Sequence, residues 1–551
     1  MDSKNCPPVT DQLSSELENG DVLKFRQQHK ASHAQVSAAV TARQNDSPWF
    51  REPLADKGAR RTPLQSIKEA MLKEARKQRR LLPLRSFVRR YADQGLLDAL
   101  PVWLLSPETM AQLFPREAVF DLVIMDEASQ CTVETGLPVL MRAKRIVIAG
   151  DEHQMPPSNY FKASTDADDT EDEDIPTDVM DAESLLVLAR DRCRHRRIAW
   201  HYRCHFEELI AFSNHAIYDG DLKTIPAIHS RAGPSSILWH SVDDASYEAG
   251  VNEKEAEAVV ELMHRLLTND ASSTIGIITF NVAQRRTVLD AIDRRCSDDA
   301  DFAAVYQRAA TDEQLDQRPF VKNLENVQGD ERDQIIFSLG HAPRRRQRKD
   351  GKDDWYVPAR FGPLGQRGGE RRLNVAASRA KRAIHLVSSF DPALLSVANT
   401  KHEGPRLFKG FLEFGQLMAK GRRSEAELVL DALRGSRRGS RQTDAMISEH
   451  YVPLKVQLLL ALQQRGHTVE LDIGSSDFRV DVAITDPNNH SFYALGIVCD
   501  EGTGEFDAFE QHVHIPAVLG LRGWQLLRVN ALDWGRQRER VLKQIEESLP
   551  S

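Results

Sequence analysis

The chain has 551 residues, of which 41% are hydrophobic and 28% are charged. One hydrophobic core rarely organises more than about 250–300 residues, so this length predicts several domains, and the ordinary composition excludes a mainly disordered or fibrous protein. The six cysteines are scattered without a CxxC pair. This excludes a disulfide framework and a cysteine-based zinc ribbon, and it favours a reducing cytosol. No apolar run approaches the roughly 20 residues that cross a bilayer, and the start has no signal-peptide layout, so we expect a cytoplasmic protein without a membrane partner.

The net charge of −8 is unevenly distributed along the chain. Residues 165–183 contain ten acidic and no basic residues, and without them the remaining chain would carry +2. We expect this acidic block to be a solvated linker. Basic residues gather at 73–90 and 344–349. Each basic run is explained equally well by a solvated face or by a binding surface, because a charge cluster alone does not identify a partner.

The elements follow in chain order from a polar start. Residues 1–60 have no sustained apolar period and predict a poorly ordered lead-in. Residues 65–98 have a helical period with one basic side. Short apolar runs then occur at 120–130, 144–157, 273–281, 332–340 and 383–390, with helical stretches such as 253–267 and 282–295 between them. Continuous apolar runs indicate strands buried on both faces of a sheet, and their alternation with helices predicts two doubly wound parallel sheets in succession.

The run at 120–130 ends in two adjacent carboxylates, Asp126 and Glu127. In a parallel sheet, polar residues at the carboxyl end of a buried strand face the ligand crevice. Two neighbouring carboxylates are costly there unless a cation or a proton compensates them. Mg²⁺ binds few carboxylates and keeps its waters, so Asp126 would hold the ion while Glu127 orients an attacking water. For this motif alone, a carboxylate that merely caps a neighbouring element stays an alternative.

Four further motifs follow in a fixed order. The second apolar run ends in GDEHQMPP (150–157), where Gly150 permits a tight turn and Gln154 is a neutral donor that could sense a terminal phosphate. The others are WHYRCHFEELIAFSNHAIYDGDL (200–222), ENVQGDERDQIIFS (325–338) and RRLNVAASRAKRAIHLVS (371–388). Together with MDEASQ (125–130) they resemble superfamily 1 helicases, in the branch of the nonsense-decay and senataxin-type enzymes. The resemblance covers Leu104 to about residue 390.

The resemblance implies an ATP-driven motor that uses Mg²⁺ and acts on single-stranded DNA or RNA. Asp126 and Glu127 look like the second (Walker B) motif, and 150–154 looks like the third, with Gln154 at the nucleotide. Arg203 would reach the γ-phosphate and Arg379 would be the arginine finger. A guanidinium fork suits the charge that spreads over a phosphoryl transition state.

Two more contacts are implied by the same resemblance. Gln328, Gly329 and Glu331 would link the nucleotide to the nucleic acid. Ser106 and Pro107, in LLSPETMAQ (104–112), resemble a nucleic-acid contact of the first domain. A plain helix cap at Ser106 explains that segment equally well.

One part of the helicase pattern does not occur in this sequence. The phosphate-cradling (Walker A) loop GxxxxGK[ST] has no match, and neither GKS nor GKT is present. Without its lysine and its backbone N–H groups, the β- and γ-phosphates lose their main binding site. The chain would then be the later part of a longer or split gene, a sequence that starts late, or a degenerate helicase. We expect ATP hydrolysis to need a loop from a missing N-terminal part or from a separate chain.

The last 105 or so residues follow a Gly/Ser/Arg-rich joint at 434–442. They predict a helix, two strands, a helix and a strand, with 478–484 and 493–499 as a hairpin. This stretch resembles a PD-(D/E)XK, restriction-endonuclease-like domain, and Asp481 and Asp500 match two of its metal-binding acids. Val498 and Lys455 stand where the resemblance expects two further carboxylates. Fewer carboxylates weaken a hard-cation site, which favours a nucleic-acid-binding remnant over an active nuclease.

The predicted fold class is α/β, with two RecA-like parallel-sheet domains, the first incomplete, and a restriction-endonuclease-like domain. The predicted boundaries are 1–60 for the lead-in, 61–195 and 196–415 for the RecA-like domains, 416–445 for a linker and 446–551 for the last domain. We consider three functions. They are an ATP-dependent helicase or translocase, a catalytically degenerate nucleic-acid-binding subunit, and a nuclease that a helicase-like part targets.

Overall fold

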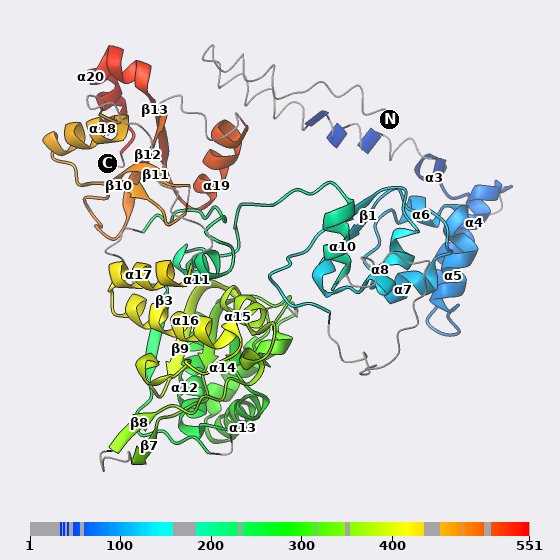
Figure 1. Ribbon diagram of the computed structural model, residues 1–551. Helices are drawn as coiled ribbons and strands as arrows, with labels where there is room; N and C mark the ends of the chain where they lie inside the picture. Colours follow the sequence, from blue (N-terminus) through cyan, green and yellow to red (C-terminus); the bar gives the residue numbers. More distant parts are fainter. Residues whose placement is uncertain are drawn as a thin grey trace. The chain divides into compact units, whose positions relative to one another are not determined.

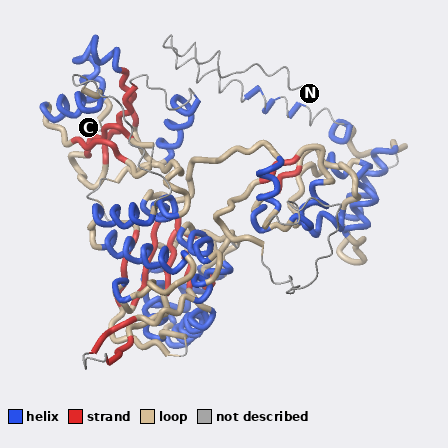
Figure 2. Tube along the Cα trace, viewed as in Figure 1, coloured by secondary structure: helices blue, strands red, loops and turns tan. Residues whose placement is uncertain are grey.

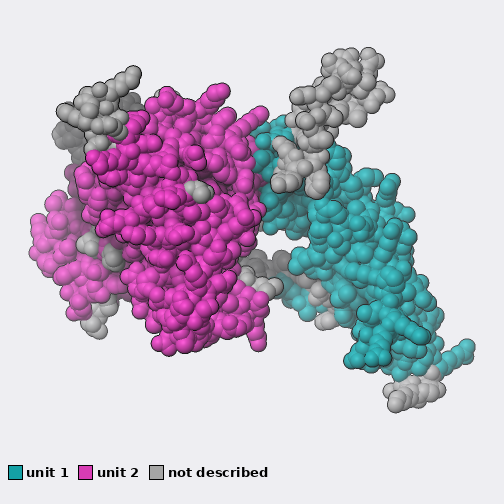
Figure 3. Space-filling model, turned by 90° about the horizontal axis from the view of Figure 1, so that it is seen from below, with its two compact units in different colours: residues 1–152, 156–196 teal, residues 153–155, 197–551 magenta. Residues whose placement is uncertain are grey.

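The computed structural model describes residues 48–55, 60–157, 183–434 and 452–549, with short gaps at 230–232, 234, 249, 315–316, 348–352, 477 and 501–508, and a few positions between 34 and 42. The chain forms two compact units, coloured separately in Figure 3. Unit 1 holds residues 1–152 and 156–196, and unit 2 holds residues 153–155 and 197–551. The acidic block lies outside the described residues except for Glu183. No helix among the described residues is long and apolar enough to cross a membrane.

Unit 1 is mainly helical. Its elements are α3 (Pro48–Arg51), α4 (Pro63–Ala75), α5 (Leu84–Tyr91), η1 (Ala92–Gln94), α6 (Leu96–Ala99), α7 (Pro107–Leu113), β1 (Val123–Met125), η2 (Ala128–Gln130), α8 (Val133–Leu140), β2 (Ile146–Ile148) and α10 (Leu185–Arg192) (Figure 1). The helical stretch expected at 65–98 is therefore several short helices. Between α4 and α5 the chain turns at Arg80, whose φ of 53° is left-handed, and Pro83 precedes α5.

The sheet of unit 1 consists of two parallel strands, β1 and β2. One side of the pair packs against α7, α8 and α10 through Val123 and Met125. The other side leaves Ile124 64% and Val147 48% exposed. This differs from the expectation that both faces are buried. The physical reason is that, within the part of the chain that the structure describes, helices cover one face only and no further strand joins the pair.

The first part of unit 2 is a doubly wound parallel sheet, as predicted. Its strand order is β3 (Ile237–Ser241), β9 (Ala380–Ser388), β6 (Arg332–Ser338), β4 (Ile275–Thr279) and β5 (Phe320–Asn323). Helices α11 (Glu208–Ala216), α15 (Gly369–Ala377), α16 (Glu403–Ala419) and α17 (Arg423–Leu433) share a core with one face. Helices α12 (Glu253–Asn269), α13 (Val282–Asp298) and α14 (Ala300–Ala310) cover the other (Figure 2). A hairpin, β7 (Arg344–Gln347) and β8 (Asp353–Tyr356), leaves this core.

The expected linker at 416–445 is wrong for residues 416–419 and 423–433, because these residues are helical. Residues 416–419 continue α16, and α17 occupies 423–433. The reason is apolar spacing, since Ala426, Leu430 and Leu433 recur at intervals of three or four residues and are buried in the core of the sheet domain. Residues 435–451, which include most of the Gly/Ser/Arg-rich joint, lie outside the described residues.

The last part of unit 2 begins with a helix and later has strands, a helix and a strand, as predicted, but three strands precede the second helix instead of two, and a final helix was not predicted. Its elements are α18 (Leu454–Gln464), β10 (Val469–Ile473), β11 (Val480–Thr485), β12 (Tyr493–Asp500), η7 (Glu510–His514), α19 (Ile515–Leu521), β13 (Leu526–Asn530) and α20 (Ala531–Glu547). The sheet is mixed, because β10, β11 and β12 are antiparallel neighbours whereas β13 runs parallel to β12. The predicted hairpin is confirmed as β11 and β12.

Candidate functional site

The acidic pair lies directly after β1 in unit 1. Asp126 is exposed and Glu127 is half-buried. Glu127 has a left-handed φ of 52°, and its backbone N–H donates to Oδ1 of Asp126 over 2.9 Å. The turn therefore presents a carboxylate that stays hydrated at a strand end. Such a group suits Mg²⁺, which keeps several waters and takes one or two protein carboxylates.

Gly150 brings the end of β2 against this turn. A Cβ on Gly150 would lie 3.1 Å from the backbone nitrogens of both Ala128 and Ser129. The N–H of Ala128 donates to the carbonyl of Ala149 over 2.9 Å. Glycine is needed here for the close approach of two backbones, a reason that the predicted tight turn did not include.

Residues 153–155 belong to unit 2 and are held by its later motifs. The N–H of Met155 donates to Oε1 of Gln328 over 3.2 Å, and Nδ2 of Asn374 donates to the carbonyl of His153 over 3.0 Å. Half-buried Gln154 lies between these two anchored residues in the chain. Gly329 follows Gln328 with a φ of +87°, a conformation that favours glycine.

Glu331 gathers cations from two other motifs. Its Oε2 accepts from Nε of Arg203 over 2.7 Å, and its Oε1 lies 2.8 Å from Nζ of Lys381. Nη1 of Arg203 also donates to the carbonyl of Ser378 over 3.2 Å. Burial alone would raise the pKa of Glu331, but the hydrogen bonds and charges of Lys381 and Arg203 outweigh it and lower this pKa. Glu331 is therefore an ionised carboxylate at neutral pH.

Arg379 is 2% exposed and folds back on the end of α15. Its Nε donates to the carbonyl of Val375 over 2.7 Å, and its Nη2 donates to Oγ of Ser378 over 3.1 Å. Its Nη1 lies 3.4 Å from the carbonyl of Asp330. The guanidinium is thus satisfied within unit 2, and it would have to turn outwards to meet a phosphate.

The cluster of Glu331, Arg203 and Lys381 does not lie at the carboxyl ends of the strands, where a ligand crevice of a parallel sheet is expected. Glu331 directly precedes β6 and Arg379 directly precedes β9, and these strands are parallel neighbours. The cluster therefore sits at the amino ends of the strands. Lys381 was missed by sequence reasoning because no periodicity or spacing marks it, and only its place in the last motif is a signal.

Two residues near Arg203, half-buried His201 and buried Cys204, are neutral. Nε2 of His201 accepts from the N–H of Cys204 over 3.3 Å. Burial, and after it the charges of Arg203, Arg522 and Arg379, lower the pKa of His201 to about 4. Burial raises the pKa of the Cys204 thiol to about 12. Neither group is a titrating catalyst near neutral pH, and both fix the backbone next to Arg203.

Ser106 caps α7, because its Oγ accepts from the N–H of Thr109 over 3.2 Å. Pro107 occupies the first position of that helix, where its missing N–H costs nothing. The cap accounts for both residue types. The nucleic-acid contact assigned to them stays a prediction.

The last part of unit 2 places the two predicted metal-binding acids on neighbouring strands. Asp481 is on β11, where its Oδ2 accepts from the N–H of Cys499 over 2.7 Å. Asp500 ends β12 and forms an ion pair with Arg528 of β13 over 3.0 Å. Nζ of Lys455 lies 2.6 Å from Oδ1 of Asp472. In the part of the chain that the structure describes, no three His, Cys, Asp or Glu residues group as a metal site.

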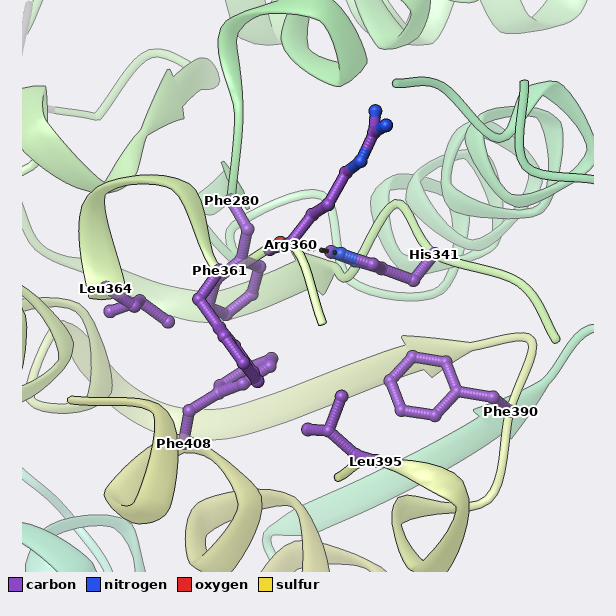
Figure 4. Close-up of a pocket in the computed structure, with 8 residues that line it drawn as sticks. All are labelled: Phe280, His341, Arg360, Phe361, Leu364, Phe390, Leu395 and Phe408. Atoms are coloured by element: carbon purple, nitrogen blue, oxygen red, sulfur yellow. Dashed lines mark hydrogen bonds between the residues drawn. The ribbon is translucent and has the colours of Figure 1, made fainter. Parts of the chain in front are cut away.

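A small cavity lies in the core of unit 2 and is distinct from these clusters. Its volume is about 10 Å³, the space of about one water molecule. Figure 4 shows the lining residues, with Nε2 of His341 bonded to the carbonyl of Arg360 over 3.0 Å. The lining residues are Phe280, His341, Arg360, Phe361, Leu364, Phe390, Leu395 and Phe408. This cavity is a packing gap and is too small for a nucleotide.

Comparison with protein-family models gives three matches. Residues 102–159 and 183–391 match two models described as AAA domains. Residues 455–549 match the model REase_MTES_1575. The helicase-like part and the restriction-endonuclease-like part of the chain thus match separate families.

Among curated proteins, the chain is similar to helicases. It is 34% identical over 330 residues to the uncharacterized ATP-dependent helicase MG140 of Mycoplasma genitalium, which is 59% of this chain and 28% of that protein. The Mycoplasma pneumoniae homologue is 33% identical over 338 residues, with the same two shares. The probable helicase MAGATAMA 3 of Arabidopsis thaliana is 24% identical over 53% of this chain and 33% of its own length. The chain therefore spans about a third or less of each of these relatives.

Among solved structures, the C-terminal domain of a possible DNA helicase from a Lactobacillus matches 37% of this chain and 96% of its own. Its sequence identity is 18% and its TM-score is 0.18, which is too low to carry an argument. The sequence comparisons thus show similarity to proteins named as ATP-dependent or probable helicases.

Proposed function

We propose that this chain is the later part of an ATP-dependent superfamily 1 helicase or translocase, which couples ATP hydrolysis to movement along single-stranded DNA or RNA in the cytoplasm. The observation that carries the proposal is the cluster around Glu331, which joins Arg203 and Lys381 from motifs nearly 180 residues apart. A surface ion pair contributes little stability. A site that responds to a phosphate needs charged groups from several motifs at one place. Here three motif segments meet at the amino ends of two neighbouring strands.

The proposal assigns the chemistry to residues of both units. Asp126 would hold Mg²⁺ through its exposed carboxylate, and the ion would neutralise charge on the β- and γ-phosphates. Glu127 would orient the attacking water. Arg203 and Arg379 would stabilise the charge that develops on the γ-phosphoryl oxygens. Gln154, tethered next to Gln328, would sense the terminal phosphate.

A phosphate-cradling loop has to come from outside this sequence, from an additional segment or from a partner chain. The exposed apolar side of β1 and β2, with Ile124 and Val147, supports this part of the proposal. Parallel sheets are normally covered on both faces. A further strand and helix carrying the loop would bury these side chains.

Apart from the match of residues 455–549 to the model REase_MTES_1575, no observation on the described residues favours the nuclease alternative. The ion pair between Asp500 and Arg528 and the lysine at position 455 both oppose the binding of a divalent cation. The degenerate-subunit alternative differs from the proposal in its chemistry. It binds nucleic acid without hydrolysing ATP.

The test is nucleic-acid-stimulated phosphate release by the chain assembled with the phosphate loop. We expect Glu127→Gln to lower kcat by at least about 100-fold, because the water loses its orienting carboxylate, while ATP binding persists. Glu134→Gln, at the start of α8, is the matched control. If phosphate release survives in Glu127→Gln, the assignment is wrong, and if the wild type never hydrolyses ATP, the degenerate-subunit alternative replaces it.

A further inference from the structure

The segment that carries Arg203 is built into the fold of the nuclease-like domain. Ile225 is buried in the same core cluster as Ile473 and Trp524. Nε1 of Trp524 donates to the carbonyl of Pro226 over 2.8 Å. The N–H of Tyr493 donates to the carbonyl of Ile228 over 2.9 Å, next to an antiparallel bridge between residues 229 and 492. Residues 200–229, named here the motif segment, therefore complete the core of a domain that begins more than 220 residues later in the chain.

Polar contacts tie the same segment to η7. Oε1 of Glu510 accepts from Nε1 of Trp200 over 2.7 Å and lies 2.9 Å from Nζ of Lys223. Burial would raise the pKa of Glu510, but Lys223 and Trp200 outweigh it and lower this pKa, so the carboxylate is charged. The hydroxyl of Tyr202 lies 2.9 Å from Nε2 of His514. The contacts of Trp200 and Tyr202 flank Arg203 on its N-terminal side.

Arg522, which follows α19, holds the backbone on both sides of Arg203. Its Nη2 donates to the carbonyl of Tyr202, and it also donates to the carbonyl of Cys204 over 3.1 Å. Arg522 is half-buried, and burial lowers its pKa from the usual value for arginine. One guanidinium that bridges two carbonyls fixes the local turn, because its donors are planar and rigid. From that turn the side chain of Arg203 reaches Glu331.

We propose that the nuclease-like domain is a clamp on the motif segment and that Arg522 is the positioning residue that sets Arg203 for phosphoryl transfer. The proposal rests on the proposed role of Arg203 at the γ-phosphate. A clamp needs the fold of the domain and its contact surface. It does not need the two carboxylates that are replaced by Val498 and Lys455.

The clamp is tested first without ATP, by hydrogen exchange on the full chain. Arg522→Met keeps the apolar stem and removes every donor. We expect the peptide over residues 200–206 to exchange about tenfold faster, because the bridged turn opens locally, while α18 and α20 keep their wild-type rates. Arg536→Met, an exposed arginine of α20, is the control and should change nothing. Wild-type exchange at 200–206 in Arg522→Met overturns the clamp.

Arg522→Lys decides the case in which Arg522→Met also loosens the whole domain. The ammonium nitrogen of lysine is one atom nearer to the backbone than Nη2 of Arg522, which donates both hydrogen bonds, and it lacks the planar guanidinium, so lysine replaces the bridge only in part. Exchange at 200–206 that is intermediate between the wild type and Arg522→Met supports the clamp. Equal exchange in both variants contradicts it.

The positioning role is tested on the chain assembled with the phosphate loop. Arg522→Met should lower kcat about tenfold and leave KM for ATP near the wild-type value, because Arg203 would act mainly in the transition state. Arg522→Lys should recover part of kcat. If the wild type hydrolyses ATP and Arg522→Met matches its kcat, the positioning role fails. If the wild type hydrolyses no ATP, the proposed function fails instead, and the exchange experiment still decides the clamp.

Discussion

At the scale of single residues, Glu255 of α12 is a buried acid near the carboxyl end of β6, whereas Glu331 lies at the amino end of that strand. It is 0% exposed, and its Oε1 accepts from the N–H of Gly340 and from Oγ of Ser338, each over 2.7 Å. Burial raises the pKa of Glu255 to about 8, although these hydrogen bonds lower it in part. The native protein therefore keeps a proton on Glu255 over a pH range in which the unfolded chain has lost it.

This difference predicts how stability depends on pH. Between the unfolded pKa of Glu255 near 4.5 and its folded pKa of about 8, the native state binds more protons, so the free energy of unfolding falls as pH rises. Glu255→Gln, which stays neutral, should flatten the fall by on the order of a few kcal/mol between pH 5 and 8. Urea unfolding of unit 2 at pH 5, 6.5 and 8 measures this. Glu257→Gln, exposed on the same helix, should keep the wild-type slope; equal slopes in both variants would refute the prediction.

The sequence predicted the acids and arginines of the candidate site through their motifs. It did not predict how they pair. Lys381 and Ser378 complete the environment of Arg203. In the sequence they cannot be told apart from an ordinary surface lysine and an ordinary serine at a helix end. The buried state of Arg379 was also not predictable, because it depends on the fold of the last turn of α15.

At the scale of elements, a basic surface lies on α4, α5 and the turn between them. Its exposed members are Lys73, Arg76, Lys77, Arg79, Arg80, Arg85, Arg89 and Arg90. Glu74 is the sole acid from 73 to 90. The opposite side of α5 packs Val88 and Tyr91 into the core of unit 1, which fixes the arginines outward. Helix α5 also packs against α7, which begins at Ser106.

If this basic surface binds nucleic acid, its removal changes the salt dependence of binding. Replacing Arg79, Arg85 and Arg89 by glutamine should weaken binding to single-stranded DNA and reduce the slope of log K against log salt by about 2. Fluorescence anisotropy from 50 to 200 mM salt measures the slope. The matched control replaces Arg308, Arg536 and Arg540, three exposed arginines of unit 2. The same loss in both triple variants would show a non-specific effect of net charge.

Strands were predicted where the sequence is continuously apolar and missed where it is not. The runs at 273–281, 332–340 and 383–390 became β4, β6 and β9, which lie inside the sheet. The missed strands, β3 and β5, are its two edges and are half-buried, so their sequences ILWHS and FVKN mix polar and apolar residues. A strand with only one neighbour needs no continuous apolar run.

At the scale of the whole molecule, local patterns predicted the parallel sheet of unit 2, but they did not predict how the last part of this unit is attached. The partners Ile225 and Trp524 lie 299 residues apart, and no periodicity links them. The incomplete sheet of unit 1 gave the opposite lesson. Its apolar strands predicted burial on both faces, and the described residues cover only one.

We propose that the acidic pair of unit 1 and the guanidinium groups of unit 2 act on one triphosphate. Spin labels at Gln130, near the acidic pair, and at Arg382, near Arg379, measure the distance between the two groups in the chain assembled with the phosphate loop. Both labelled residues are exposed. A label pair at Arg308 and Arg382, both in unit 2, serves as the control. We expect that Mg²⁺ and a non-hydrolysable ATP analogue shift the distances between the two labels to one short and narrow distribution. A broad distribution of label distances that does not change when the nucleotide is added would contradict this proposal.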